Sequence, residues 1–465
     1  MPLQSSYGLE IGGDDGELQA SLSAADSNMD FGTSFDDVWD FSIGQPWTDI
    51  GSPIPSIPAS PPESIASVSL SLYNPSLVPA LECPTDKALL NHYSTIVASV
   101  LSRQADNTTN PFLSYIIPMT LSSELVLDCV LILSAKHWSR LQPQMGSRGA
   151  VHQSKATQSL ANLLSHVDKT SIGIALLSCL LLCMAELLDG TSSKWKLHLE
   201  GAKRLVTTLR LEHHDSLTGD YKFLIKLSRF LDSAVTTSTC KPPLINRNKD
   251  DTAELDPSST PDDDDRALYG IPKQLFHIVD QINRLADKRS TRVDASSEEA
   301  FRLEAATVGE WLDRWSFEYG GPSRAVESLF PGSDDVIHAT KAYEWALKLR
   351  LHQITEGYTP TDAIVTQAVE GITDAVQKVR YGSPLEGCLL FPLVMAGGAC
   401  DQLEHRVIIQ DRLMVMERTC GFGYVYRARD LVERVWNRRD QADGGGARVN
   451  WARIRFSEMN GLVIF

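Results

Sequence analysis

The chain has 465 residues, 43% of them hydrophobic, and a formal net charge of −16 at pH 7. Every Lys and Arg follows Thr85, whereas residues 1–83 contain twelve Asp or Glu, so the remainder holds 47 acidic against 43 basic residues. The acidity therefore belongs to the N-terminal tail, which excludes a strongly acidic body. The length allows two or three domains or one large helical body.

The eight cysteines stand at positions 83, 129, 179, 183, 240, 388, 400 and 420, and no two are separated by only two residues. This spacing excludes a zinc ribbon and a redox dithiol, and several of the cysteines lie in apolar runs, as reduced core cysteines do. The stretch from Met1 to Tyr7 has no basic residue and does not resemble a secretory signal. We therefore expect an intracellular protein.

Residues 1–83 form a tail that we expect to be disordered. They are rich in Ser, Pro, Gly and Asp, and the stretch from Gly51 to Pro62 alternates proline with small residues, which is incompatible with a helix or a central strand.

Within this tail, residues 30–49 interleave large aromatic and acidic side chains and contain no positive charge. We interpret residues 30–49 as a candidate activation segment, a stretch that binds the transcription machinery. Its candidate residues are Phe31, Phe35, Asp36, Asp37, Trp39, Phe41 and Trp47. Neighbouring carboxylates repel one another and keep the rings exposed, so that they can enter a partner groove, as a short helix that orders on binding. The alternative is an acidic solubilising tail, but such a tail has little use for five large aromatics in twenty residues.

Helical periodicity begins at Thr85, a candidate N-cap, and a second helix is expected from Ser122 or Ser123. The apolar run from Ile172 to Ala185 is too short to span a membrane and is interpreted as a buried helix that ends before Gly190. The next helix shows apolar residues at steps of three and four, and the two are expected to form an antiparallel hairpin. Its apolar positions are Trp195, Leu199, Ala202, Val206 and Leu209.

Residues 246–266 contain few apolar side chains and two prolines, so they predict an exposed, mobile, acidic loop. Helical pattern resumes at Pro272, and a second flexible loop is expected from Asp440 to Ala447. The two clearest later helices carry apolar stripes at Val365, Val369, Ile372, Val376 and Val379, and at Val425, Ala428, Val432 and Val435. Strand alternation is scarce, which predicts an all-α bundle or solenoid-like body over residues 85–465.

Enzyme interpretations are weak. The run from Asp262 to Asp265 is typical of the magnesium site of an all-helical terpene cyclase, but it follows Pro261 in a polar stretch, which favours a solvated charge run. His137, His198, His213 and His214 show no metal-ligand spacing, and nucleophile-elbow and phosphate-loop motifs are absent from the sequence. We therefore expect no catalytic residue, metal or cofactor.

Basic residues are scattered. The helix from Arg427 to Arg439 mixes Asp430 and Glu433 with its arginines and carries an apolar stripe, so an amphipathic surface helix is favoured over a DNA-binding one.

Short motifs in a fixed order resemble the C-terminal regulatory region of fungal zinc-cluster (Zn2Cys6) transcription factors, from about Thr85 to Phe465. In the first half these are Asn110-Pro111-Phe112, Pro118, Ser134-Ala135, His137, the apolar helix ending at Cys183 and Glu186, Trp195, His198-Leu199 and Gly201-Ala202. In the second half they are Leu390 to Leu393, Gly397, Asp411-Arg412, Gly421-Phe422-Gly423, Val435-Trp436 and Trp451.

The resemblance implies an all-α regulatory domain in a nuclear protein that controls a metabolic or secondary-metabolite gene set. That family reads DNA through six zinc-binding cysteines, whereas this sequence has no cysteine before Cys83 and no Cys-x-x-Cys pair, so no zinc-binding or DNA-contacting residue is carried over.

The leading hypothesis is that the protein is a transcriptional regulator, an activator, that does not associate with membranes. We expect it to bind the transcription machinery or co-regulator proteins, to contact DNA through a partner protein, and to respond to a small-molecule effector. The alternative is an all-helical enzyme or ligand-binding protein, which a large cavity with converging charged side chains would favour and a filled apolar interior would oppose.

Overall fold

The computed structural model describes residues 81–104, 109–212, 219–239, 241, 243, 263–318, 334–360, 362–441 and 448–465. All of them belong to one compact unit, Pro79–Phe465. The tail up to residue 80, the activation segment 30–49, His213 and His214 lie outside the described residues.

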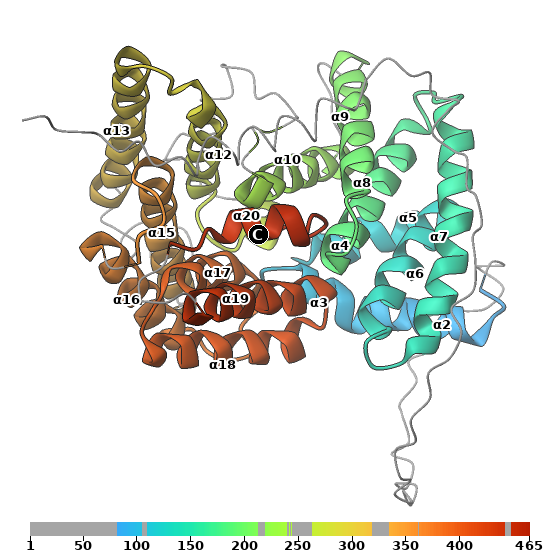
Figure 1. Ribbon diagram of the computed structural model, residues 1–465. Coiled ribbons are helices and arrows are strands. Elements are labelled where there is room, and N and C mark those ends of the chain that lie inside the picture. Colours follow the sequence, from blue (N-terminus) through green and yellow to red (C-terminus); the bar gives the residue numbers. More distant parts are fainter. Residues whose placement is uncertain are drawn as a thin grey trace, which may run out of the picture. The chain divides into compact units, whose positions relative to one another are not determined.

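Within these ranges every regular element is a helix and no strand occurs, which confirms the all-α prediction (Figure 1). The first half contains α2 (Pro84–His92), a π-helical turn (Tyr93–Val97), α3 (Ala98–Leu101), α4 (Pro111–Ser114), α5 (Ile116–Ser122), α6 (Glu124–Trp138), α7 (Pro143–Leu164), α8 (Ile172–Asp189), α9 (Trp195–Glu212) and α10 (Gly219–Thr239). The second half contains α11 (Asp263–Tyr269), α12 (Gln274–Asp287), a 3₁₀ turn (Lys288–Thr291), α13 (Ala295–Glu318), α15 (Asp334–Thr355), α16 (Ala363–Lys378), a 3₁₀ turn (Pro384–Leu389), α17 (Leu390–Ala399), α18 (Leu403–Cys420), α19 (Gly423–Gln441) and α20 (Trp451–Glu458).

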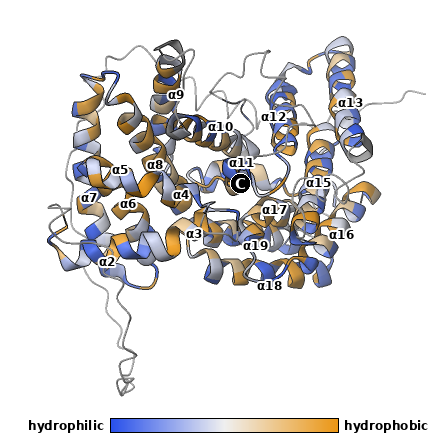
Figure 2. Cartoon of the chain, turned by 180° about the vertical axis from the view of Figure 1, so that it is seen from behind, coloured by the Kyte–Doolittle hydropathy of each residue, from blue (hydrophilic) through white to orange (hydrophobic). Residues whose placement is uncertain are grey.

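Helices α6 and α8 form the centre of the first half. Ser123 caps α6, as predicted, because its hydroxyl accepts a hydrogen bond from the amide of Val126. Helix α8, which is mostly hydrophobic (Figure 2), is the one described helix long and apolar enough to cross a membrane, but 89% of it is buried inside the protein. It ends at Gly190, whose φ of 73° is the left-handed conformation that the sequence predicts there. Helix α8 is therefore the core helix that the length of its apolar run indicates.

Several neighbours in sequence pack as helical hairpins. Helix α8 packs against α9, as predicted, and α6 packs against α7 and α15 against α16. Trp195, Leu199 and Val206 of α9 are all buried. Because each hairpin buries one face against the next, the apolar stripes form the common core.

Helices α10 to α13 connect the two halves. Helix α10 contacts α8 and α12, while α12 and α13 both contact α15 (Figure 1). Helix α17 is buried along its whole length and packs between α15, α16, α18 and α19. Helix α8 also contacts α19 directly, and this contact joins the first half of the body to the second.

Some predicted boundaries are wrong. The folded body begins before Thr85, because Leu81 is buried and α2 starts at Pro84. The predicted loop 246–266 ends too late, since Asp263 to Arg266 form the first turn of α11. Acidic residues are stabilised at a helix N-terminus by the helix dipole, which is why this charge run is helical. Likewise, Asp440 belongs to α19 rather than to the predicted loop 440–447.

Candidate effector pocket

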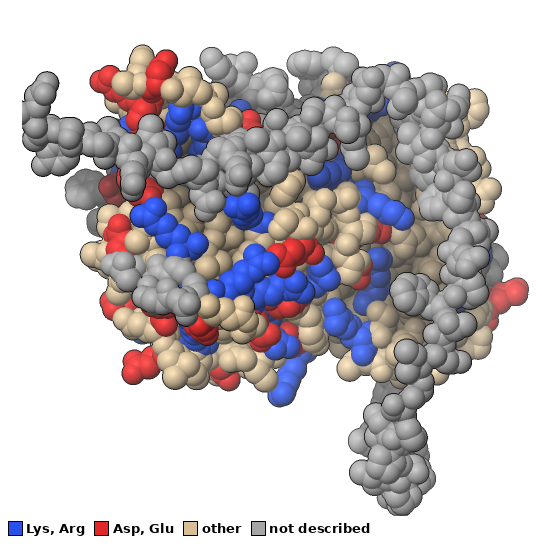
Figure 3. Space-filling model, in the orientation of Figure 1, with Lys and Arg blue, Asp and Glu red and all other residues tan. Residues whose placement is uncertain are grey.

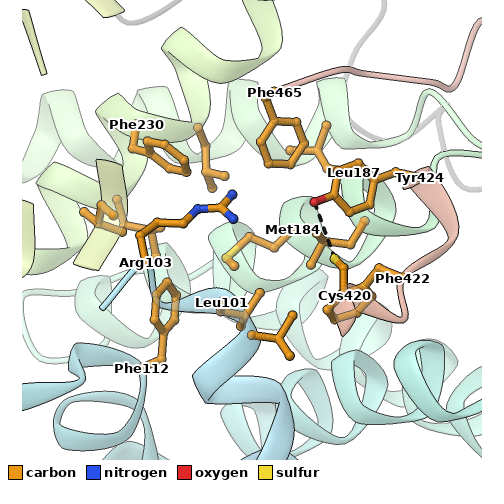
Figure 4. A pocket seen from close by; sticks show the side chains of 15 residues that line it. Leu101, Arg103, Phe112, Met184, Leu187, Phe230, Cys420, Phe422, Tyr424 and Phe465 are labelled. Carbon is orange, nitrogen blue, oxygen red and sulfur yellow. Dashed lines mark hydrogen bonds between the residues drawn. The ribbon is translucent and has the colours of Figure 1, made fainter. Parts of the chain in front are cut away.

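A small cavity lies where both halves of the helical body meet. Its volume is about 30 Å³, which is enough for about two water molecules. The second half contributes Leu268, Cys420, Phe422, Tyr424 and Phe465 to its walls (Figure 4). The first half contributes Val100, Leu101, Arg103, Phe112, Met184, Leu187, Leu188, Leu227, Phe230 and Leu231. The walls are therefore almost wholly apolar and come from elements far apart in sequence.

Two motifs of the family-like pattern place aromatic rings in this wall. Asn110 caps α4, since its side-chain oxygen accepts from the amide of Phe112 while its amide nitrogen donates to the carbonyl of Ala98, 2.9 Å away. Gly421, with φ of 70°, ends α18 and turns Phe422 inward. An added Cβ at Gly421 would come within 2.7 Å of the His137 ring, so glycine is needed there for both conformation and space.

Arg103 is the one charged residue among those that line the cavity. Its backbone amide donates to the carbonyl of Ala267, 2.8 Å away, which ties the end of α3 to α11, and its guanidinium points into the pocket (Figure 4). A Cβ at Gly387 would overlap an Arg103 Nη atom, so the absence of a side chain at Gly387 makes room for the guanidinium. No carboxylate pairs with Arg103 in the part of the chain that the structure describes; the neighbouring groups are the Tyr424 hydroxyl and the thiols of Cys388 and Cys420.

The thiols near Arg103 are not activated nucleophiles. Burial raises the pKa of Cys388, and burial raises that of Cys420 despite a contact of 3.6 Å between its sulfur and the Tyr424 hydroxyl. Both therefore stay neutral, and a neutral thiol is a poor nucleophile and does not balance the arginine charge.

The C-terminal residue forms one side of the pocket. The ring of Phe465 stacks on Tyr424 with centroids 5.3 Å apart and planes 14° apart. It follows α20 in an extended segment whose carbonyls are held by side chains, with Arg455 donating to Leu462 over 2.9 Å and Thr237 donating to Ile464. This wall is not part of a helix, so it can move without breaking helical hydrogen bonds.

A second buried basic cluster, in the first half, is fully paired. His152 of α7 contacts Asp128 of α6 through Nδ1 at 2.7 Å and Asp86 of α2 through Nε2 at 3.0 Å. Arg148 donates two hydrogen bonds to Asp86, at 2.7 and 2.6 Å. Burial opposes a charge on His152, but the hydrogen bonds to Asp128 and Asp86 outweigh it and raise the pKa of His152. We call these four residues the His152 network; it joins α2, α6 and α7.

His137 and His198 serve packing, as the sequence favours. His137 hydrogen bonds to His92 over 3.0 Å and meets Phe422 edge-on. Burial and the neighbouring His92 lower the pKa of His137 to about 4, so the pair is neutral at physiological pH. Burial also lowers the pKa of His198. Among the described residues no three His, Cys, Asp or Glu side chains are placed to hold a metal ion.

The acidic run at 262–265 is not a solvated loop in the residues described. Asp265 is buried and lies 3.1 Å from Lys273 and 3.7 Å from Lys226, and Asp263 pairs with Arg266. These carboxylates therefore stabilise α11 through cationic side chains of the protein.

The arginines of α19 are mostly paired with acids, in agreement with an amphipathic helix. Arg429 contacts Glu417 and Glu433, and Arg434 contacts Asp430, so blue and red side chains alternate over this face (Figure 3). Arg439 differs from the prediction, because it is buried and donates to the carbonyls of Gly398 and Cys400 at the end of α17. It caps the negative end of that helix.

The fungal specific transcription factor domain matches residues 88–461, so the chain belongs to this family and is a transcriptional regulator. It is similar to the acriflavine sensitivity control protein acr-2 of Neurospora crassa, with 21% identity over 462 residues that cover 91% of this chain and 76% of that protein. No solved structure matches the chain. Membership of the family indicates a non-enzymatic protein that acts in the nucleus and interacts with DNA or the regulatory machinery.

Sequence reasoning missed the residues that define the pocket. Arg103, Tyr424 and Phe465 follow no motif and show no periodic signal, and only the folded chain brings them together. The pocket is apolar and almost filled, which is the observation expected to count against the enzyme alternative.

Proposed function

We propose that this regulator is an activator of a metabolic or secondary-metabolite gene set and that residues 30–49 recruit the transcription machinery or a co-regulator. The observation that carries the proposal is the composition of this segment, with Phe31, Phe35, Trp39, Phe41 and Trp47 set among aspartates and no basic residue. Aromatic rings kept in water by neighbouring charges gain the most from a partner groove.

The helical body supplies control rather than chemistry in this proposal. Its interior is apolar, His137 is neutral, and burial keeps the thiols of Cys388 and Cys420 neutral. A partner protein makes the DNA contact in this proposal, and the DNA sequences that this partner binds determine which genes are regulated. The similarity to a protein named for control of acriflavine sensitivity favours a regulated response to small molecules.

A reporter assay of the whole chain, fused to an unrelated DNA-binding domain, tests the activation segment. Replacing Phe35, Trp39 and Phe41 by Ala removes rings that lie outside the described residues, and we expect at least a tenfold loss of output. The matched control replaces Thr33, Ser34 and Ser42 by Ala and keeps the output. Unchanged output from the first variant, at equal protein level, would reject the assignment of these rings.

The acidic positions are tested separately. Asp36→Asn with Asp37→Asn removes two charges that keep the rings apart, so we expect a partial loss, smaller than that of the ring variant. If the tail only keeps the protein soluble, both variants should give the same reporter output as the wild type.

A further inference from the structure

The cavity around Arg103 combines a half-buried cation with apolar walls, and no carboxylate of the described residues pairs with that cation. Arginine stays protonated in proteins, because its pKa lies above about 12. A cation surrounded by hydrocarbon is unfavourable unless an anion or several hydrogen-bond acceptors face it. Among the side chains drawn around the guanidinium in Figure 4, none is a carboxylate.

The contrast with three other arginines of the same chain, Arg412, Arg439 and Arg148, supports this interpretation. Arg412 is buried and lies 3.2 Å from Glu386, and Arg439 donates to two helix-terminal carbonyls. Arg148 is held by both oxygens of Asp86. Each of these guanidinium groups has carboxylate or carbonyl acceptors in the protein, whereas the acceptor beside Arg103 is the Tyr424 hydroxyl and the guanidinium also faces the cavity.

We propose that the Arg103 cavity is a binding site for a small organic carboxylate with an apolar, planar body. The guanidinium presents two parallel N–H groups that match a carboxylate, and the surrounding Phe112, Phe230 and Phe422 match a hydrocarbon ring. Polyhydroxylated anions fit poorly, because the walls offer few hydrogen-bond partners for hydroxyl groups.

Phe465 is the side chain that the ligand displaces. The cavity as it stands holds about two water molecules, so it does not admit a ring. The Phe465 ring occupies one wall, stacks on Tyr424, and belongs to an extended segment rather than a helix. Its movement would open a ring-sized space next to Arg103 while α8, α10 and α19 stay in place.

Calorimetric titration of the full-length protein with 2-naphthoate and with neutral 2-naphthamide tests the site. We expect the acid to bind at least tenfold more tightly than the amide, because both have the same ring and only the acid complements Arg103. Phe465→Ala should strengthen the binding of both probes and keep the preference for the acid, since no side chain then needs to be displaced.

Arg103→Met should remove the preference while leaving the binding of the amide within a factor of three. The matched control, Arg302→Met on α13, changes an arginine that is exposed and paired with Glu298, and it should keep the wild-type preference. Melting temperatures of all variants establish that they are folded.

Equal affinity for acid and amide in the wild type and in Phe465→Ala would overturn the proposal, as would a preference that survives in Arg103→Met. Absence of binding of either probe to both the wild type and Phe465→Ala would also overturn it. The wild-type and Phe465→Ala titrations decide the matter even if Arg103→Met does not fold. Because these are binding measurements, their failure leaves the proposed activator function standing.

Discussion

The His152 network and the Arg103 cavity are two basic sites of the helical body in which the cations are surrounded in opposite ways. In the network, Asp86 and Asp128 neutralise His152 and Arg148 over distances of 2.6 to 3.0 Å. In the cavity, Arg103 faces apolar walls, a tyrosine hydroxyl and two neutral thiols. Paired buried charges are costly to break, whereas an uncompensated charge costs stability for as long as it remains. We therefore describe the His152 network as a structural clamp, because it holds α2, α6 and α7 together, and the Arg103 cavity as the proposed ligand site.

The clamp should be the more sensitive of the two sites. Asp86→Ala leaves the buried His152 and the half-buried Arg148 without their shared carboxylate, so we expect the free energy of unfolding to fall by about 3 kcal/mol. Urea denaturation measures this loss. Asp313→Ala, at a side chain that is 80% exposed, is the control and should change stability by less than about 0.5 kcal/mol. Equal effects of the two variants would contradict the description of the network as a clamp.

Truncating the movable wall of the cavity should cost less than breaking the clamp. Phe465→Ala removes a buried ring from a non-helical segment beside an existing cavity, so we expect a loss of about 2 kcal/mol, below the usual range for a buried Phe. Thermal and urea unfolding provide the value. A loss above that of Asp86→Ala would mean that Phe465 anchors the fold and is not a displaceable wall.

The pH dependence of stability should reveal the clamp as well. Because the pKa of His152 is raised in the folded protein, its contribution is full below the unfolded value of about 6.5 and is lost as the pH rises through the folded-state pKa. The pKa of Asp86 is lowered by Arg148 and His152 against the effect of burial, so its contribution is lost only as the pH falls through that lowered value. The network is therefore strongest between about pH 4 and 6.5.

Unfolding free energies of the wild type and of His152→Gln at pH 5.5 and 8.5 test this. The difference between the two proteins should shrink at the higher pH. A difference that is constant across this range would show that His152 does not carry the charge.

The cavity arginine should have the smallest effect on stability. Arg103→Met exchanges an uncompensated cation for an apolar side chain of similar length, so we expect a change within about 1 kcal/mol, or a gain. Urea denaturation beside Asp86→Ala makes the comparison direct. A loss as large as that of Asp86→Ala would indicate that Arg103 has structural acceptors and would remove the basis for a ligand site.

Much of the fold could be predicted from the sequence where apolar residues recur at helical spacing. Helices α6, α8, α16 and α19 were predicted in this way, and Gly190 marked the end of α8 correctly. Helix α7 gives no such signal, because its buried face consists of Gly149, His152, Ala156 and Leu160, only one of which is a large apolar residue. Small and paired polar residues pack well without raising the apolar periodicity.

The pocket could not be predicted, because its residues come from segments that are separated by most of the body. Leu101, Met184 and Phe465 become neighbours only through the packing of α8 against α10 and α19. The acidic run before Arg266 was predicted wrongly for a different reason. Four consecutive aspartates are typical of a loop, yet three of them form the first turn of α11, because the helix dipole and cationic neighbours stabilise them.

The central claim is that the residues that activate transcription lie in the N-terminal tail of this regulator. The most direct test fuses residues 1–80 alone, and separately the whole chain, to an unrelated DNA-binding domain and measures the output of a reporter gene. The account predicts strong output from residues 1–80 that depends on Phe35, Trp39 and Phe41. Silence from both fusions, with both proteins present in the nucleus, would contradict it.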